Sequence, residues 1–600
     1  MVYNPRDVAD QEYDIVVVGG GTAGCVIASR LSEDPSLKIL LLEAGQSGKT
    51  NPMTLTPWAF LGYWHTEHEW GLSTDPQVHA ANRTVFWPRG KLLGGCNALI
   101  RFHYSFHYGA PSDYDEWAHL QKGQPGAEGW SYSAIHPYFQ KFEKYSPSKT
   151  WPDIDATLHG AQGPVEVGYR GHFGSYTKDF IDASSAVGIA HNNDINTHKG
   201  TLGVTKRLTK HIVTYIDKKG QRVTSERAYL TPDVLARTNL TVATGAYVNR
   251  VLFKSIGSSI RATGVEYRNK NGSIFVSRAR KEVVLSAGAV HTPHVLMLSG
   301  VGPAEHLKSV GVPVIKALPG VGSSLKDHPV IDTRYASKHP DTLDYLGRPK
   351  NLVQRGQSSM AVLQYQLNGT GPLTSNIIEA AAFVRSDDPA LFPPEKYSEW
   401  STPEDTTTGK AAPDLEMFLS AMGYKDNAQT EFDHPTGYTF GMHAVCLRPK
   451  SSGTIRLKSK NPEDPPLIDA HYLEDHNDIK TLIRGLRLID ATVKQEPLAS
   501  RIDHSGDMYP DLEHDLSEKT DAELEQFVRE NVSTLFHPAC SARMAPLEDG
   551  GVVDSFLRVH GIPNLRVADA SVFPSIVAGH TTAPVYAIAE KASELIRNEF

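Results

Sequence analysis

A glycine-rich turn between an apolar strand and a helical segment constrains the fold of this chain more than any other feature. Residues 13–18 form a short apolar run rich in β-branched side chains, and residues 19–24 read Gly-Gly-Gly-Thr-Ala-Gly. Apolar residues then recur at helical spacing, and a second apolar run ends at Glu43. This order predicts a βαβ unit whose glycines let a pyrophosphate approach the N-terminus of a helix.

This predicted unit supplies the first candidate binding residues. The carboxylate of Glu43 can accept hydrogen bonds from ribose hydroxyls, and an acid at this point favours FAD or NAD over NADP. The alternative is a structural turn without a nucleotide, because glycine-rich turns are common. The candidate dinucleotide contacts in the turn are Gly19, Gly21, Thr22, Ala23 and Gly24.

Length and charge narrow the class of protein further. The chain has 600 residues, more than one ordinary core holds, so we expect two domains. Its formal net charge of -8 offers no basic surface to a phosphate backbone, so we expect no nucleic acid partner. The sequence shows neither a secretion signal nor an apolar run long enough to span a membrane. We therefore expect an intracellular, cytoplasmic protein.

The cysteines give no sign of a metal or redox site. Their spacing fits no CxxC motif, and their number is too small to cross-link a chain of this length. We expect four free thiols and no metal ion. The four residues are Cys25, Cys96, Cys446 and Cys540.

Four further motifs resemble those of the glucose-methanol-choline oxidoreductase family, in order along nearly the whole chain. Residues 88–95 resemble the first family signature, and residues 288–302 match the second signature at each specified position. Residues 320–328 are similar to the family motif GVGxNLxDH. The fourth block, residues 536–596, contains the two histidines of a His-His pair, as in members that carry this pair at the flavin.

The resemblance implies an α/β, Rossmann-like FAD-binding domain of the glucose-oxidase type and an α+β substrate-binding domain. We expect the FAD domain to be discontinuous, assembled from residues 1–120, 210–328 and 531–600. Residues 121–209 and 329–530 are expected to form the substrate domain.

The chemistry of alcohol oxidation explains why histidines belong at such a site. The hydroxyl proton must leave while a hydride leaves the carbon, and histidine titrates close enough to neutral pH to accept that proton. We expect His537 to be the base and His580 to orient the alcohol oxygen. The other FAD contacts implied by the resemblance are Arg89, Gly94, Gly95, Asn97, Val248, Asp569, Ala570, His580 and Thr581.

Aromatic residues near these motifs point to the kind of alcohol. Phe536 precedes the expected base, and its ring can line the substrate site by stacking on an aromatic alcohol, as in aryl-alcohol oxidases. Residues 51–84 are expected to form a long ordered loop whose aromatic side chains line the entrance, although each could be an ordinary packing residue. We expect structural or surface roles for His103, His107, His291, His294 and His328.

One segment departs from the family pattern. After Gly95 the family usually continues Ser-Ser-x-Ile-Asn, whereas this chain continues Cys-Asn-Ala-Leu-Ile. We interpret Asn97 as standing in for the motif asparagine near the flavin ring. The alternative is that the altered segment, residues 96–106, shifts the flavin, weakens FAD retention or lowers activity.

We predict FAD-dependent oxidation of a primary, aromatic or allylic alcohol to an aldehyde, with O2 as acceptor and H2O2 as product. A dehydrogenase that passes electrons to a quinone is the first alternative, because these motifs do not fix access of oxygen to the flavin. A non-redox lyase or cyclase and a flavin-free binding protein are further alternatives, since one fold hosts many activities. The sequence specifies neither the alcohol nor the oligomeric state.

Overall fold

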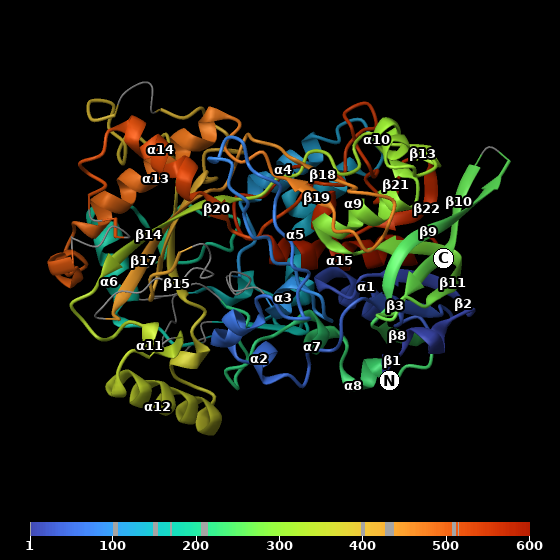
Figure 1. Cartoon of the computed structure of the whole chain (residues 1–600), viewed down its shortest axis with the longest axis horizontal. Coiled ribbons are helices and arrows are strands. Elements are labelled where there is room, and N and C mark those ends of the chain that lie inside the picture. The colour runs from blue at the N-terminus through green and yellow to red at the C-terminus, as the bar shows by residue number, and fades with distance from the viewer. Residues whose placement is uncertain are drawn as a thin grey trace.

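Two large β-sheets organise the computed structural model of the chain (Figure 1). Each sheet draws its strands from segments far apart in the sequence. The structure describes residues 2–99, 106–147, 154–168, 171–205, 214–257, 259–347, 349–397, 402–425, 437–506, 512–513 and 515–600.

The first sheet contains nine strands within these described residues. Its order is β1-β8-β3-β2-β11-β10-β9, and β22 pairs with both β11 and β21. The central strands β8, β3, β2, β11 and β22 run parallel, whereas β9 and β10 form an antiparallel extension. The strands are β1 (Val2–Tyr3), β2 (Glu12–Val18), β3 (Ile39–Glu43), β8 (Leu240–Thr244), β9 (Tyr247–Ile256), β10 (Ser259–Arg268), β11 (Ile274–Leu285), β21 (Arg558–Val559) and β22 (Ile562–Val567).

The second sheet contains seven strands in the part of the chain that is described. It is antiparallel apart from one short parallel pair, and α6 and α13 pack against its strands. Its order is β20-β14-β17-β16-β15-β7-β6. The strands are β6 (His191–Asn192), β7 (Gly203–Thr205), β14 (Pro329–Ala336), β15 (Ile378–Val384), β16 (Leu415–Ser420), β17 (Thr439–Cys446) and β20 (Ser533–Thr534).

Helices and short strand pairs complete the fold. The remaining strands are β4 (Glu143–Ser146), β5 (Val165–Gly168), β12 (Val301–Gly302), β13 (Lys316–Ala317), β18 (Thr454–Arg456) and β19 (Leu467–Asp469). The α-helices are α1 (Thr22–Leu31), α2 (Pro52–Leu55), α3 (Cys96–Leu99), α4 (Pro111–His119), α5 (Tyr132–Phe142), α6 (Ser175–Ala186), α7 (Ser225–Tyr229), α8 (Pro232–Leu235), α9 (Gly288–Leu298), α10 (Ala304–Ser309), α11 (Asp344–Gly347), α12 (Leu352–Asn368), α13 (His476–Val493), α14 (Asp521–Asn531) and α15 (Thr582–Arg597).

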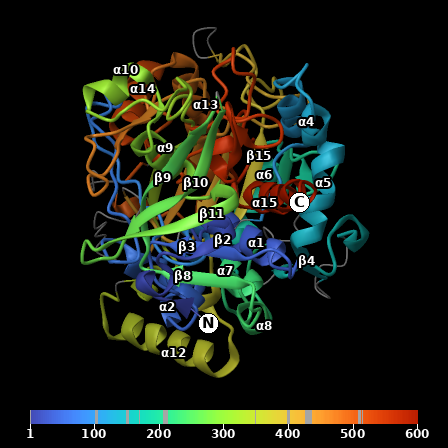
Figure 2. The same ribbon diagram turned by 90° about the vertical axis from the view of Figure 1, so that its right-hand side faces the viewer.

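The predicted βαβ unit is confirmed as β2, α1 and β3, and glycine is required at two positions of its turn. Gly19 has φ +95°, and a Cβ atom there would lie 2.6 Å from the Ser286 carbonyl oxygen. A Cβ atom on Gly24 would lie 1.8 Å from the Gly19 carbonyl oxygen. The missing side chains therefore let α1 begin directly above the ends of β2 and β11. Figure 2 shows these strands side by side with α1 and α15 beside them.

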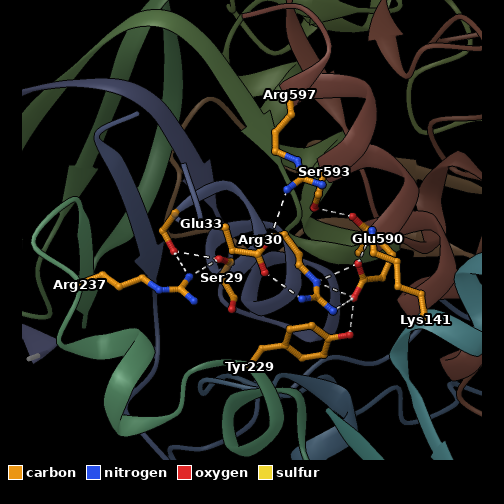
Figure 3. Close-up of polar contacts among 11 residues, drawn as sticks. Ser29, Arg30, Glu33, Lys141, Tyr229, Arg237, Glu590, Ser593 and Arg597 are labelled. Carbon is orange, nitrogen blue, oxygen red and sulfur yellow. Dashed lines mark hydrogen bonds and ion pairs between the residues drawn. The ribbon is translucent and has the colours of Figure 1, made fainter. Parts of the chain in front are cut away.

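A buried ion pair joins α1 to α15, which come from opposite ends of the chain (Figure 3). The Arg30 Nε atom lies 2.9 Å from both carboxylate oxygens of Glu590, and a second guanidinium nitrogen lies 2.8 Å from one of them. The Tyr229 hydroxyl donates to the same carboxylate at 2.7 Å, and the Lys141 ammonium lies 3.2 Å away. Because the Glu590 side chain is fully buried, these partners replace the water that would otherwise solvate it.

The predicted division into domains can be compared with the two sheets. All strands of the first sheet lie in the three segments predicted for the FAD domain, and six strands of the second lie in the substrate segments. Strand β20, however, comes from the last FAD segment and pairs with β14, while α5 from a substrate segment packs against α15. The proposed boundaries therefore stay a prediction.

Residues 51–84 are more regular than the loop we expected. They contain α2 and a 3-10 helix, Pro57–Tyr63. Prolines occupy the first turns of both helices, where a missing backbone N–H costs no hydrogen bond. The expectation of four free thiols is confirmed.

Candidate active site

A cavity of 340 Å³ opens at the carboxyl ends of β2, β3 and β11, the edge at which parallel sheets bind their ligands. Residues from four of the five motif blocks line it. The predicted FAD contacts in the lining are Gly19, Gly21, Thr22, Ala23, Glu43, Arg89, Gly95, Val248, Asp569, Ala570 and Thr581.

The N-termini of three helices meet at this cavity. The lining includes the first turns of α1, α9 and α15. None of these first turns contains Asp or Glu. Unpaired N–H groups and the helix dipole make such an end favourable for an anion. The ends of α1 and α15 therefore suit the pyrophosphate of a dinucleotide, whereas the first N–H of α9 already donates to the carboxylate of Asp569.

The turn also leaves room for a ligand at one glycine. A Cβ atom on Gly21 would meet no protein atom closer than 3.9 Å, whereas one on Gly19 or Gly24 would collide with the backbone. The backbone of Gly21 thus borders open space at the N-terminus of α1. The residues present fit a bound FAD, whose pyrophosphate would lie against this backbone.

Two buried carboxylates frame the cavity. The side chain of Glu43 accepts from the backbone N–H groups of Gly20 at 2.7 Å and Gly45 at 2.8 Å. Asp569 accepts from the Gly288 N–H at 2.8 Å and the Thr292 hydroxyl at 2.6 Å, so it holds the start of α9. Burial raises the pKa of both carboxyl groups, and their hydrogen bonds oppose that shift.

Aromatic and imidazole rings line another part of the cavity. The Trp70 and His291 ring centroids are 4.1 Å apart, and the Arg268 guanidinium lies 4.8 Å from the Tyr247 ring centroid. Val248, predicted to contact the adenine, lies beside them in the lining. Burial lowers the pKa of His291 to about 3, so this ring is neutral at pH 7.

Three buried histidines form a cluster behind the lining of the cavity, which none of them joins. The Nδ1 atoms of His328 and His537 are 2.9 Å apart, and the ring centroids of His537 and His580 are 5.0 Å apart at an interplanar angle of 82°. Pro538 directly follows His537, and Thr581 directly follows His580. Both Pro538 and Thr581 line the cavity. The structure thus brings His537 and His580 together, although 43 residues separate them in the sequence.

Hydrogen bonds fix the backbone around His537. The N–H of His537 donates to Asp327 at 2.8 Å, and the same carboxylate accepts from the Thr534 hydroxyl. Phe536 has φ +64°, a conformation that non-glycine residues adopt rarely. Its carbonyl oxygen accepts from Arg89 at 2.9 Å, and its N–H donates to Thr534 at 2.7 Å. These bonds hold the turn that presents the His537 ring.

His580 is held from the second sheet. Its Nε2 atom lies 3.2 Å from a carboxylate oxygen of Glu416, a fully buried residue of β16. The ring of His107 lies 6.2 Å from that of His580 and stacks on Phe383 of β15. Burial, followed by the charge of His580, lowers the pKa of His107 well below its usual value. His580 is therefore anchored through Glu416 to the second sheet.

Some predicted FAD contacts lie behind the lining. Gly24 packs against the Gly19 carbonyl group, and the N–H of Gly94 donates to the Gly20 carbonyl oxygen at 2.8 Å. The side chain of Asn97 donates to the Tyr586 hydroxyl at 2.7 Å, and its oxygen accepts from the Ser225 N–H. Its predicted contact with the flavin stays a prediction, and residues 100–105 of the atypical segment lie outside the described residues.

Several site residues were not expected from the sequence. His328 contacts His537, His107 lies beside His580, and His291 and His294 line the cavity. His107, His294 and His328 are buried, and His291 is half-buried. His103 lies outside the described residues. The GVGxNLxDH motif was a signal for His328, because its last two residues are the Asp327 and His328 that hold His537. No local pattern marked Glu416.

The described parts of the chain contain neither a three-residue metal site nor a helix suited to crossing a membrane. No group of three or more His, Cys, Asp or Glu side chains there could hold a metal ion. No helix among the described residues has the length and apolar character to cross a membrane.

Comparison with known proteins places this geometry in a family. Models of the GMC oxidoreductase family match residues 13–330 and 449–589. Dehydrogenase str4 of Strobilurus tenacellus is 37% identical over 98% of this chain and 94% of its own length. An alcohol dehydrogenase [acceptor] of Pseudomonas putida is 35% identical over 97% of this chain and 95% of its own length.

Solved structures agree with the sequence comparison. A fungal aryl-alcohol oxidase has a TM-score of 0.79 and 25% identity, and the alignment covers 98% of this chain and 99% of that one. The matched ranges include the glycine turn, the three helix N-termini and both predicted catalytic histidines. The chain belongs to the GMC oxidoreductase family, and it is an FAD-dependent enzyme that acts on CH–OH groups.

Proposed function

We propose that the protein oxidises a primary alcohol, aromatic or allylic, to the aldehyde with His537 as the base. The observation that carries the proposal is the cluster of His537, His580 and His328, whose chain neighbours Pro538 and Thr581 line the dinucleotide cavity. When bound, FAD accepts a hydride at flavin N5. The residues of this chain then have to bind the alcohol, remove its hydroxyl proton and keep water out.

The contact between His328 and His537 defines which nitrogen of the base is available. Burial lowers the pKa of His328 to about 3, so this ring stays neutral and carries one proton. In the productive arrangement the Nδ1–H of His537 donates to Nδ1 of His328, at the observed 2.9 Å. Nε2 of His537 is then a lone-pair acceptor for the hydroxyl proton. His328 acts as a positioning residue.

His580 completes the proposed binding site for the alcohol oxygen. Glu416 accepts from Nε2–H of His580, so Nδ1 of that ring accepts a hydrogen bond when the ring is neutral and donates one when it is protonated. A protonated His580 beside Glu416 would stabilise the developing alkoxide. The hydroxyl proton passes to His537. The hydride leaves the carbon that bears the hydroxyl group, and this carbon becomes the carbonyl carbon of the aldehyde.

An apolar wall supports an aromatic or allylic substrate. Phe536, the predicted substrate-lining residue, is buried, and its ring centroid lies 6.0 Å from that of Trp64. It packs in one cluster with side chains from the site-facing side of the second sheet. The aromatic members of this cluster are Tyr63, Phe383, Phe418, Tyr424 and Phe536. Such a wall favours a flat, weakly polar substrate over a sugar.

O2 is the first proposed acceptor, with H2O2 as product, and the similarity to an aryl-alcohol oxidase supports it. A quinone or related acceptor is the second candidate, favoured by the dehydrogenase names of two relatives. In either case the alcohol loses two electrons and two protons, and the acceptor gains them.

Anaerobic titration of the purified holoenzyme tests the proposal. Benzyl alcohol should bleach the blue absorbance of oxidised flavin, whereas 2-phenyl-2-propanol, an aromatic alcohol without a hydrogen on the carbinol carbon, should not. Colour that returns in air with H2O2 identifies an oxidase, and colour that returns only with a quinone identifies a dehydrogenase. If no primary alcohol bleaches FAD-loaded protein, the proposed reaction is wrong.

A further inference from the structure

Helix α12 presents large apolar side chains to solvent. Six of the fifteen exposed large apolar side chains among the described residues lie on this single helix of 17 residues. In both ribbon views α12 lies at the lower edge of the molecule, apart from the sheets (Figures 1 and 2). The exposed fractions are 83% for Leu352, 67% for Val353, 63% for Met360, 45% for Leu363 and 71% for Leu367.

The face of α12 that contacts the protein is polar or small. Gln354 and Ala361 are its two buried residues, and Tyr365 is half-buried. The Gln354 amide donates to the Gly437 carbonyl at 3.2 Å and accepts from the Lys350 N–H at 2.6 Å. A surface helix normally buries its apolar stripe and exposes its polar one, and α12 does the reverse. Its outward face is therefore built to contact something apolar.

The surroundings of this face carry positive charge. Between Asp344 and Glu379 the sequence contains three basic residues and no acidic one, in a chain whose net charge is -8. Two of the basic residues, Lys350 and Arg355, lie at the start of α12. At its other end Gly369 packs against the backbone of the exposed Lys219, next to Lys218. The stripe thus has Lys350 and Arg355 near one end and Lys218 and Lys219 near the other, and an apolar stripe flanked by basic residues is typical of helices that lie in the interface of an anionic bilayer.

The size of the face argues against a second copy of the chain. A helix of 17 residues is about 26 Å long and about 10 Å wide, so its outward face covers about 260 Å². A stable protein interface buries about 800 Å² on each partner. An interfacial helix needs no such area, because lipid adapts to its shape and the basic residues add attraction to anionic headgroups.

We propose that α12 docks this protein on an anionic phospholipid surface, with Val353, Met360, Leu363 and Leu367 inserted among the acyl chains. Apolar packing continues from this helix towards the site. Ala361 belongs to a cluster with Trp58 and Tyr345, and Trp64 packs against both this cluster and the one that contains Phe536. Helix α12 is therefore linked by apolar packing to the cluster that contains Phe536.

Vesicle flotation of the FAD-loaded enzyme tests the docking. Protein should float with vesicles of phosphatidylcholine and phosphatidylglycerol, and much less with phosphatidylcholine alone. Lys350→Gln and Arg355→Gln should each weaken this partition by about five-fold, and added salt should weaken it further. The combined variant Val353→Gln, Met360→Gln, Leu363→Gln and Leu367→Gln should stay unbound.

A matched variant controls for general loss of surface apolarity. Val78→Gln with Ile256→Gln and Ile274→Gln removes exposed apolar side chains elsewhere and should float like the unmodified protein. All variants should keep FAD, melting temperature and turnover of a water-soluble alcohol, so failure of docking and failure of the proposed reaction are separable. Absence of flotation, or flotation of the α12 variant, would overturn the proposal. If sedimentation shows that the unmodified protein is a dimer and that the combined α12 variant is a monomer, the exposed face of α12 binds a second copy of the chain instead.

Discussion

At the scale of single residues, the protonation of His328 decides how His537 can work. The two Nδ1 atoms are 2.9 Å apart, so one proton must lie between them. Burial, followed by the charge of His580, lowers the pKa of His328 to about 3, so His328 does not take up a second proton near pH 7. The position of the shared proton then sets whether Nε2 of His537 accepts or donates.

The neutral His328 also makes a defined contribution to stability. Its pKa in the folded protein, about 3, lies below the ordinary value of about 6.5, so below pH 6.5 the unfolded chain binds the extra proton. The stability that the folded protein owes to a neutral His328 is therefore fully present above about pH 6.5, and it is lost as the pH falls towards 3. When the pH falls from 7 to 5, the free energy of unfolding of the unmodified holoenzyme should fall by some amount. That of His328→Gln should fall by about 2 kcal/mol less.

Urea titration at both pH values measures this difference. The exposed His79 provides the control, because His79→Gln should leave the pH dependence unchanged. Equal pH dependence in the His328 variant and the unmodified protein would mean that His328 is protonated as easily as a free histidine.

Residues within motifs were predictable, and pairs between motifs were not. The turn at Gly19 and the acid Glu43 follow from a local pattern, and both line the cavity. The contacts of His328 with His537 and of Glu416 with His580 span 209 and 164 residues. Only the pairing of strands in the second sheet brings such residues to one place, and sequence spacing contains no trace of it.

At the scale of elements, Gly21 and Gly24 of the β2–α1 turn have different structural roles. Gly24 lets α1 approach the backbone of Gly19, whereas Gly21 borders the open cavity. The first is needed for folding of the βαβ unit, and the second is needed for the approach of a pyrophosphate. Substitution by alanine separates these roles.

We expect Gly21→Ala to fold and to lose FAD, because its methyl group meets no protein atom within 3.9 Å but enters the ligand space. Gly24→Ala should fail to accumulate as folded protein, because its Cβ atom would lie 1.8 Å from a carbonyl oxygen. Circular dichroism and bound flavin per chain measure the two effects. Full flavin content in Gly21→Ala would contradict the placement of the pyrophosphate.

The sequence predicted elements well where the pattern was long. The apolar run of residues 13–18 and the run ending at Glu43 became the strands β2 and β3 of the first sheet. The helices of residues 51–84 were missed, because they span only four and seven residues and contain too few turns to show a helical period.

At the scale of the whole molecule, the first and last parts of the chain pack against each other. Helix α15 packs on α1, and the buried pair of Arg30 and Glu590 fixes their contact (Figure 3). Removing one partner of a buried ion pair leaves the other charge without compensation. The N-terminal nucleotide turn and the C-terminal histidine segment are thereby coupled through one interface.

Glu590→Gln should lower the free energy of unfolding by about 3 kcal/mol, because Arg30 and Lys141 would lose their buried partner. Glu33 is the matched control, since it pairs with Arg30 and Arg597 at the surface. Glu33→Gln should cost less than about 1 kcal/mol. Thermal and urea unfolding of the holoenzyme compare the two, and equal losses would refute a special role for the buried pair.

The most direct test of the account is single-turnover reduction of the flavin in His537→Ala. Mixed anaerobically with an alcohol that reduces the unmodified enzyme, the variant should keep its FAD but reduce it about 10²- to 10⁴-fold more slowly, the share that a general base contributes. His79→Ala should match the unmodified enzyme. Reduction of the His537 variant at the unmodified rate would contradict the central claim that His537 removes the hydroxyl proton.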